Sequence, residues 1–284
     1  MKKIKAGVYI EGRFPGVTVG AICLPEGTIL IDSPLRPADS QSWLEDLEKV
    51  GATRPSILIN LDSHPDRSLG AREMRSPVMQ HQQAAQDSRQ RAAIFKSLKQ
   101  ESGSEWETLD GLGALRWQHA EILFEGENRL KLGNGDVVVI DAAGPGPGAS
   151  WIDYREGKVL FVGDCVSKNE APFLGNADID AWQESLKRLL SKEFAGYKII
   201  ASRGGEIGSG DIQAMQVFLR DVKQRLNRLG ARKAPYAEAG KLAEKLFEKY
   251  KYAAKNKKKF VLRLRQGLQN NYIAEFLPNQ KVNY

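Results

Sequence analysis

Short apolar runs separated by glycine and proline turns fill the first 60 residues of the chain. Their β-branched content predicts strands, and Pro15-Gly16 and Pro25-Glu26-Gly27 predict the turns between them. Apolar residues three and four positions apart predict one helix, which Gly51 ends. The predicted strands are 7–11, 17–24, 28–31 and 57–61, and the predicted helix is 40–50.

The remainder repeats this order of strands first and helices after. A polar, helix-prone stretch over 81–100 is low in large apolar residues, so we expect it on the surface. Phe260–Leu264 is left open as a last strand or helix. The predicted strands are 121–124, 129–132, 137–140, 150–154, 159–162 and 198–201, and the predicted helices are 179–190, 211–229 and 237–252.

Composition fits an ordinary globular protein, with 284 residues, 42% hydrophobic and 27% charged. No apolar run approaches the roughly 18 residues needed to span a bilayer, and the apolar stretch near the amino terminus is too short for a signal peptide. We therefore expect a cytoplasmic protein. Cys23 and Cys165 lie far apart in apolar segments, which favours two small buried side chains over a disulfide or a thiolate metal site.

The positive charge is concentrated near the carboxyl end. Between Arg232 and Arg265 there are 12 Lys or Arg against 3 Glu, which exceeds the net charge of +7 for the whole chain. The rest of the chain is therefore slightly acidic. This asymmetry predicts a basic helical appendage, whose lysines form a solvated helix face rather than a nucleic-acid or acidic-membrane surface. Binding of nucleic acid by the tail is the less favoured alternative.

The loop after the buried strand 57–61 carries the chemistry. Asp62, His64 and Asp66 stand at alternate positions, and Arg67 follows at once. The carboxyl end of a strand is where α/β sheets place their binding sites. His81 and His119 lie in polar or strand-flanking surroundings, so we expect surface or packing roles for both.

Five segments in this order resemble the metallo-β-lactamase superfamily over roughly residues 7 to 215. They are 27–32, the loop 62–67, the turn 144–148, the strand end 160–164 and the turn 202–205; the helix with Asp178, Trp182 and Leu186 resembles it too. The resemblance implies an α/β fold, an αββα sandwich of two mixed β-sheets flanked by helices. We assign residues 1–230 to that domain and 231–284 to a basic helical extension packed on it.

The resemblance also implies metal-ligand positions, and most of them have changed. The five family histidines correspond to Asp62, His64, Arg67, Pro145 and Gly204, so one histidine remains. Proline and glycine have no ligand atom in the side chain, and a protonated guanidinium has no lone pair to donate. The sequence therefore predicts that the two-zinc hydrolase activity has been lost.

Two interpretations of the remaining site follow from the resemblance. In the first, Arg67 stands where the second metal stood and pairs with Asp66 and Asp164, so the site is a buried ion-pair cluster without metal. In the alternative, Asp62, His64 and Asp164 hold one divalent ion (Zn, Mn or Fe), and Asp66 or Asp164 acts as the base.

That alternative would be a mononuclear hydrolase of a small ester, lactone or thioester. Arg203, in the turn 202–205, is a candidate anion-binding residue. As partners we expect a small-molecule ligand or substrate, and the sequence leaves a homodimer open.

Overall fold

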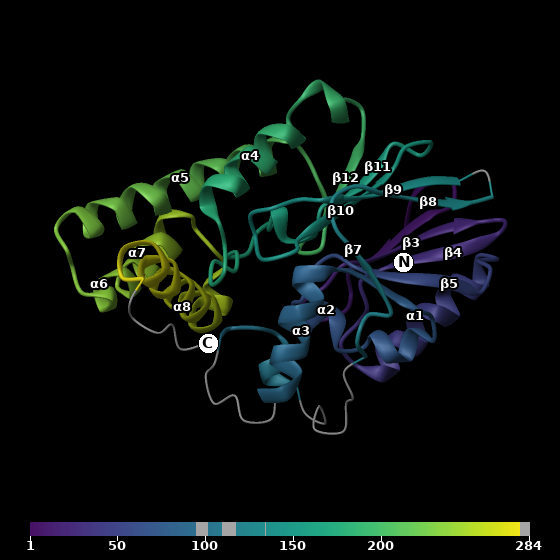
Figure 1. Cartoon of the computed structure of the whole chain (residues 1–284), viewed down its shortest axis with the longest axis horizontal. Coiled ribbons are helices and arrows are strands. Elements are labelled where there is room, and N and C mark those ends of the chain that lie inside the picture. Colours follow the sequence, from purple (N-terminus) through teal and green to yellow (C-terminus); the bar gives the residue numbers. More distant parts are fainter. Residues whose placement is uncertain (95–101, 110–117, 134, 279–284) are drawn as a thin grey trace.

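The computed structural model describes residues 1–94, 102–109, 118–133 and 135–278. Two mixed β-sheets pack face to face between helices (Figure 1). The first sheet has the order β1-β2-β3-β4-β5-β6-β7, antiparallel from β1 to β4 and parallel from β4 to β7. Its strands are β1 (Lys2–Lys5), β2 (Val8–Glu11), β3 (Val19–Leu24), β4 (Gly27–Ile31), β5 (Pro55–Asn60), β6 (Val78–His81) and β7 (Ile122–Phe124).

The second sheet has the order β13-β12-β11-β10-β9-β8. All its neighbours are antiparallel except β11 and β12, which run parallel. Its strands are β8 (Asn128–Leu132), β9 (Gly135–Asp141), β10 (Ser150–Tyr154), β11 (Val159–Phe161), β12 (Lys198–Ala201) and β13 (Gly205–Ile207).

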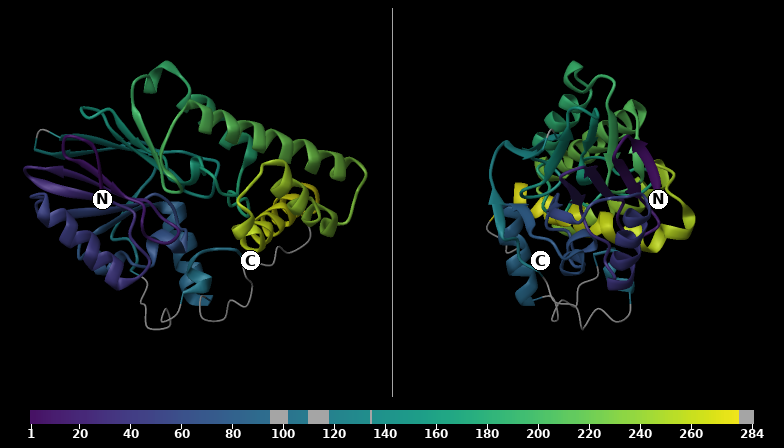
Figure 2. Two further views of the ribbon diagram at one scale, coloured as in Figure 1. Left: turned by 180° about the vertical axis from the view of Figure 1, so that it is seen from behind. Right: turned by 90° about the vertical axis from the view of Figure 1, so that its right-hand side faces the viewer.

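Helices cover both outer faces and one end of the sandwich. The helices before β7 lie below the first sheet, α4 and α5 lie above the second, and α6 to α8 close one end (Figures 1 and 2). The α-helices are α1 (Pro37–Lys49), α2 (Pro65–Ser68), α3 (Gln82–Ile94), α4 (Ile179–Leu189), α5 (Ser209–Ala231), α6 (Tyr236–Gly240), α7 (Leu242–Lys249) and α8 (Lys257–Phe276). The 3-10 helices are η1 (Ala71–Met74), η3 (Trp106–Thr108), η5 (Gly163–Cys165), η6 (Lys192–Phe194) and η7 (Ala254–Asn256).

The alternation of side chains along each strand builds three apolar layers. In β4, Ile29 and Ile31 face the second sheet, while Leu30 faces α1. In β9, Val139 faces the first sheet and Val138 faces the helices above. Strands covered on both faces need apolar residues on both, which explains why these segments are continuous apolar runs rather than alternating ones.

The predicted fold class is confirmed, and several element boundaries differ. The strands β1, β6 and β13 were not predicted, and the predicted helix 237–252 is divided into α6 and α7. Phe260–Leu264 belongs to α8. The helix-prone stretch forms α3, but Ala84 and Ala85 are buried, so its inner face is part of the core. Residues 95–100 of that prediction lie outside the described residues.

The carboxy-terminal helices share the core above the second sheet. Leu246, Phe260 and Leu264 belong to the same buried cluster as Trp151 and Trp182. The proposed division at residue 230 falls within the last turn of α5 and stays a prediction. No helix within the described ranges combines the length and apolar character that crossing a membrane requires. Both cysteines are free; Cys165 is buried as predicted, whereas Cys23 is only partly buried.

Candidate functional site

The site lies where the edges of the two sheets meet, and Asp32 ties them together. Asp32 directly follows β4. Its carboxylate accepts a hydrogen bond from the Leu61 amide (3.0 Å) and another from the Ser202 hydroxyl (2.9 Å). Asp32 is fully buried and has a left-handed backbone (φ 56°). Strained backbone of this kind persists where surrounding contacts determine it. The ends of β4, β5 and β12 are thereby fixed to one another.

The Asp62–Arg67 loop turns directly into the short helix α2. His64 precedes the helix, and its Nδ1 accepts a hydrogen bond from the Asp66 amide (3.3 Å). Pro65 occupies the first helical position, where its missing N–H costs nothing. The turn directs Asp66 and Arg67 inward, and both are fully buried.

Arg67 lies among three carboxylates. Its guanidinium donates a hydrogen bond to Asp164 Oδ2. Arg67 Nε lies 3.3 Å from Asp62 Oδ1, and Nη1 lies 4.0 Å from Asp32 Oδ2. The backbone carbonyl of Arg67 accepts two hydrogen bonds from Ser33, so the main chain is held as well. A planar cation with several donors can neutralise several carboxylates at once, which a lysine ammonium does less well.

A second buried guanidinium, Arg203, holds the other carboxylate of the loop. Its Nη2 donates to Asp66 Oδ2 (3.0 Å), and its Nε lies 3.3 Å from Asp164 Oδ1. Asp66 also accepts hydrogen bonds from the amides of Glu105 (3.2 Å) and Trp106 (2.9 Å). Asp164 therefore lies between two arginines, and each arginine reaches a different carboxylate of the loop.

A third arginine enters from α8. Arg263 donates to the carbonyls of Gly103 (2.8 Å) and Ala171 (2.8 Å) and to Glu170 Oε2 (3.0 Å). The ring of Phe173 lies 3.9 Å from the Arg263 guanidinium carbon and 4.7 Å from that of Arg203. Cation–π contacts are strongest when desolvated, so this ring helps to hold two like charges inside the protein.

Burial and ion pairing act in opposite directions on the acids of this cluster. Burial raises the pKa of Asp32 to about 7, even though the Arg67 charge opposes the rise. Burial also raises the pKa of Asp62, with Arg67 opposing it and Asp164 adding to it. Burial would raise the pKa of Asp164 too, but the charges of Arg67 and Arg203 outweigh it and hold that pKa below its usual value. Asp164 is therefore the firmly ionised acid of the cluster.

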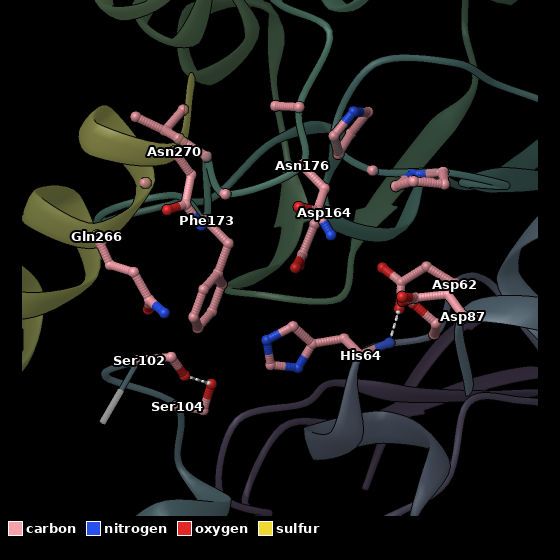
Figure 3. Close-up of a pocket in the computed structure, with 18 of the residues that line it drawn as sticks. Asp62, His64, Asp87, Ser102, Ser104, Asp164, Phe173, Asn176, Gln266 and Asn270 are labelled. Carbon is pink, nitrogen blue, oxygen red and sulfur yellow. Dashed lines mark hydrogen bonds between the residues drawn. The ribbon is translucent and has the colours of Figure 1, made fainter. Parts of the chain in front are cut away.

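A cavity of about 810 Å³ opens beside this cluster (Figure 3). It lies between the Asp62–Pro65 loop, α3, residues 102–107, the turn 145–147, residues 173–178 and α8. The ring of His64 faces it and lies 4.4 Å from the ring of Phe173. The side chains of Asp62 and Asp164 form part of its wall, whereas Arg67 and Arg203 lie behind that wall.

The structure brings the predicted site residues together, with one exchange of partners. Arg67 pairs with Asp164 as predicted, but Asp66 pairs with Arg203 instead of Arg67. Across the described ranges, no three His, Cys, Asp or Glu side chains are arranged to hold a metal ion. Metal binding by Asp62, His64 and Asp164 therefore stays a prediction.

Several residues of the site were not predicted from the sequence. Arg263, Glu170 and Phe173 gave no signal, because a helix arginine and two loop residues resemble ordinary surface positions. Asp32 ended a segment of the resemblance, and its burial could not be read from the segment alone. His81 is buried and packs edge-on against Phe124 (5.3 Å), which is a packing role. A packing role was one of the two expected for it.

Comparison with known proteins places the fold. The family model described as the metallo-beta-lactamase superfamily matches residues 12–201. The curated proteins give no match. A metallo-beta-lactamase family protein of Thermus thermophilus has a similar structure, with 16% identity, 96% of this chain and 95% of that chain covered, and a TM-score of 0.68.

Two other solved structures are similar as well. The sec-alkylsulfatase Pisa1 of a Pseudomonas species shares 15% identity and a TM-score of 0.72, with 96% of this chain but 49% of that chain covered. A metallo-beta-lactamase of Pontibacter korlensis shares 17% identity and a TM-score of 0.56, with 77% and 97% covered. At these identities the likeness concerns the fold.

Proposed function

The chain belongs to the metallo-β-lactamase superfamily, and we propose that it is a diverged member that binds a small molecule without metal and has lost dinuclear zinc hydrolysis. The observation that carries the proposal is the pair Arg67 and Arg203. Their guanidinium groups contact the carboxylates of Asp62, Asp66 and Asp164, the acids that the resemblance assigns to the metal sites.

The residues present do not fit a divalent metal pair. Zinc, manganese and iron need ligand atoms with lone pairs, and two positions of the site now carry fully buried cations. The pKa values of both guanidinium groups stay above their usual value, because the attraction of Asp164 and the neighbouring acids outweighs the effect of burial. A divalent ion beside two permanent positive charges would be repelled by both.

The backbone at Gly204 makes it difficult to restore a metal-ligand histidine at this position. Its backbone has φ 104°, and a Cβ at this position would lie 2.5 Å from the Cβ of Lys168. A histidine would be strained here, so this turn favours glycine and offers no side-chain ligand. The same turn positions Arg203, which now supplies the positive charge.

Metal analysis of the full-length protein, purified without chelator, tests the proposal. We expect zinc, manganese and iron well below one equivalent, and a melting temperature that neither EDTA nor added zinc changes. One equivalent or more of tightly bound metal, lost in the His64→Ala variant, would instead support the mononuclear site and refute the proposal. The His119→Ala variant is the matched control, since His119 is exposed and does not line the cavity.

A further inference from the structure

Neutral amide side chains project into the cavity from two separate parts of the chain. Asn176 comes from the loop before α4, and Gln266 and Asn270 extend from α8 toward Phe173 (Figure 3). None of the three side chains has a hydrogen-bond partner within the described residues. Asn270 is only 9% exposed, but its amide atoms are not among the fully buried polar atoms without a partner, so the amide still borders the open cavity. Buried amides are usually hydrogen-bonded, and an unsatisfied one at a cavity wall is a group that a ligand can satisfy.

The charged groups of the wall, by contrast, already have partners. Five carboxylates line the cavity, and each one accepts at least one hydrogen bond from the protein: Asp62, Asp87, Glu107, Asp164 and Asp178. Arg263 is the one Lys or Arg among the described lining residues, and its guanidinium already donates hydrogen bonds to two carbonyls and to Glu170.

This charge distribution selects against ionised ligands. A carboxylate, phosphate or sulfate would meet five carboxyl side chains and no uncommitted cation among the described lining residues. An ammonium group would be repelled by the buried guanidinium groups of Arg67, Arg203 and Arg263. Uncharged groups face neither cost, and they match the amides that remain.

The rest of the wall is carbon surface. Pro145, Pro147, Phe173 and Leu174 present rings and aliphatic carbons to the cavity. Its volume of about 810 Å³ lies within the range of small-molecule sites, about 300–1,000 Å³. An amide both donates and accepts hydrogen bonds, and so does a hydroxyl group. A molecule with hydroxyls along its edge and C–H groups on its face fits both parts of the wall.

We propose that this cavity binds an uncharged, hydroxyl-rich ligand of the sugar class, held by Asn176, Gln266 and Asn270. This inference rests on the proposed metal-free binding function and specifies the ligand class for that site. It concerns binding only and needs no chemical step.

Isothermal titration of the full-length protein tests the ligand class directly. The neutral probes are glucose, maltose and lactose, and glucuronate and glucosamine are the charged probes on a matched ring. We expect saturable binding of at least one neutral sugar, and binding of glucuronate and glucosamine at least about tenfold weaker than that of glucose, a difference of about 1.4 kcal/mol. The proposal is overturned if no neutral sugar binds or if either charged sugar binds more tightly than glucose.

Variants locate the binding. Asn270→Leu should weaken sugar binding about tenfold by removing hydrogen bonds of a buried amide. Asn227→Leu, on the exposed side of α5, should leave it unchanged. Gly175→Leu adds a side chain whose Cβ would lie 3.7 Å from Asn270 Nδ2, an ordinary contact, so it should fill the cavity without disturbing the fold. Gly210→Leu, where the added Cβ meets nothing within 4 Å, is its control.

The two proposals fail in different ways. Sugar binding that is unchanged in both Asn270→Leu and Gly175→Leu, with melting temperatures equal to the parent, would place the ligand elsewhere and overturn this inference. Metal-free protein that binds no sugar would also overturn it, while leaving the loss of the zinc site standing. Stoichiometric metal in the same preparation would instead refute the proposed function.

Discussion

Replacing Arg67 with methionine removes the guanidinium group but keeps a side chain of similar length. The fully buried site then contains Asp32, Asp62 and Asp164 without the cation that all three now share. Arg203 still pairs with Asp164, so the loss falls most heavily on the two other acids. Methionine fills the space without adding a polar group, and the change therefore reports on charge rather than on a cavity.

The magnitude follows from the burial of the partners. Removing one member of a buried ion pair costs about 3–5 kcal/mol, because the remaining charge stays uncompensated. For a chain of this size about 1 kcal/mol corresponds to roughly 2 °C in melting temperature, so a decrease of roughly 6–10 °C is expected near neutral pH. The exposed residue Arg54 provides the control, since Arg54→Met should change the melting temperature by no more than about 1 °C.

The pH dependence of the Arg67→Met effect separates charge from packing. In the parent, the pKa of Asp164 is below its usual value, so its stabilisation is present above the unfolded pKa of about 3.9 and is lost as pH falls through the lower folded value. In the variant the acids lose an ion-pair partner and take up protons more readily. The difference in unfolding free energy between the parent and Arg67→Met should therefore decrease as pH falls from about 7 to about 4.

Thermal melts of parent, variant and Arg54 control at several pH values measure this. If Arg67→Met overlays the parent at neutral pH, the guanidinium does not neutralise the cluster and the reasoning is refuted.

Three further predictions concern the same region. Burial raises the pKa of Asp32 to about 7, so its ionisation destabilises the folded parent increasingly as pH rises from the unfolded pKa toward 7. The free energy of unfolding of Asp32→Asn, measured in urea, should therefore rise by about 2–3 kcal/mol relative to that of the parent between about pH 5 and pH 8. A difference in unfolding free energy that does not change with pH would contradict this. Gly204→His should lower stability by at least about 1 kcal/mol, because of its positive φ and the contact with Lys168, and added zinc should not restore it in a thermal melt. Phe173→Ala should destabilise the protein by about 2–4 kcal/mol, because it removes the ring's packing and its cation–π contacts with Arg203 and Arg263; Phe173→Leu should recover only the packing part of that loss.

The sequence was sufficient for the fold because local pattern and order along the chain agree with it. Continuous apolar runs such as Ile57–Ile59 and Val137–Ile140 fit strands that are covered on both faces. The strands β1 and β13 were missed for the opposite reason: they are short edge strands, and β1 is largely exposed, so their pairing partners rather than their own residues make them strands.

The site was predictable in its composition and less so in its pairing. Asp62, Asp66, Arg67 and Asp164 do meet, because the strand ends that carry them lie at one edge of the sandwich. Which arginine pairs with Asp66 depends on side-chain paths that no spacing encodes, and Arg203 reaches it across 137 positions of sequence.

Because Arg263 lies near the carboxyl end, the site is completed late in the synthesis and folding of the chain. The residue contacts Gly103 across 160 positions and Glu170 across 93 positions of sequence, and both contacts close long loops. During synthesis, Glu170 leaves the ribosome well before its positive partner exists as a peptide. Long-range contacts of this kind also raise contact order, which slows folding. The growing chain can form both sheets early, while the cavity beside them takes its final shape only after α8 has packed against the rest of the protein.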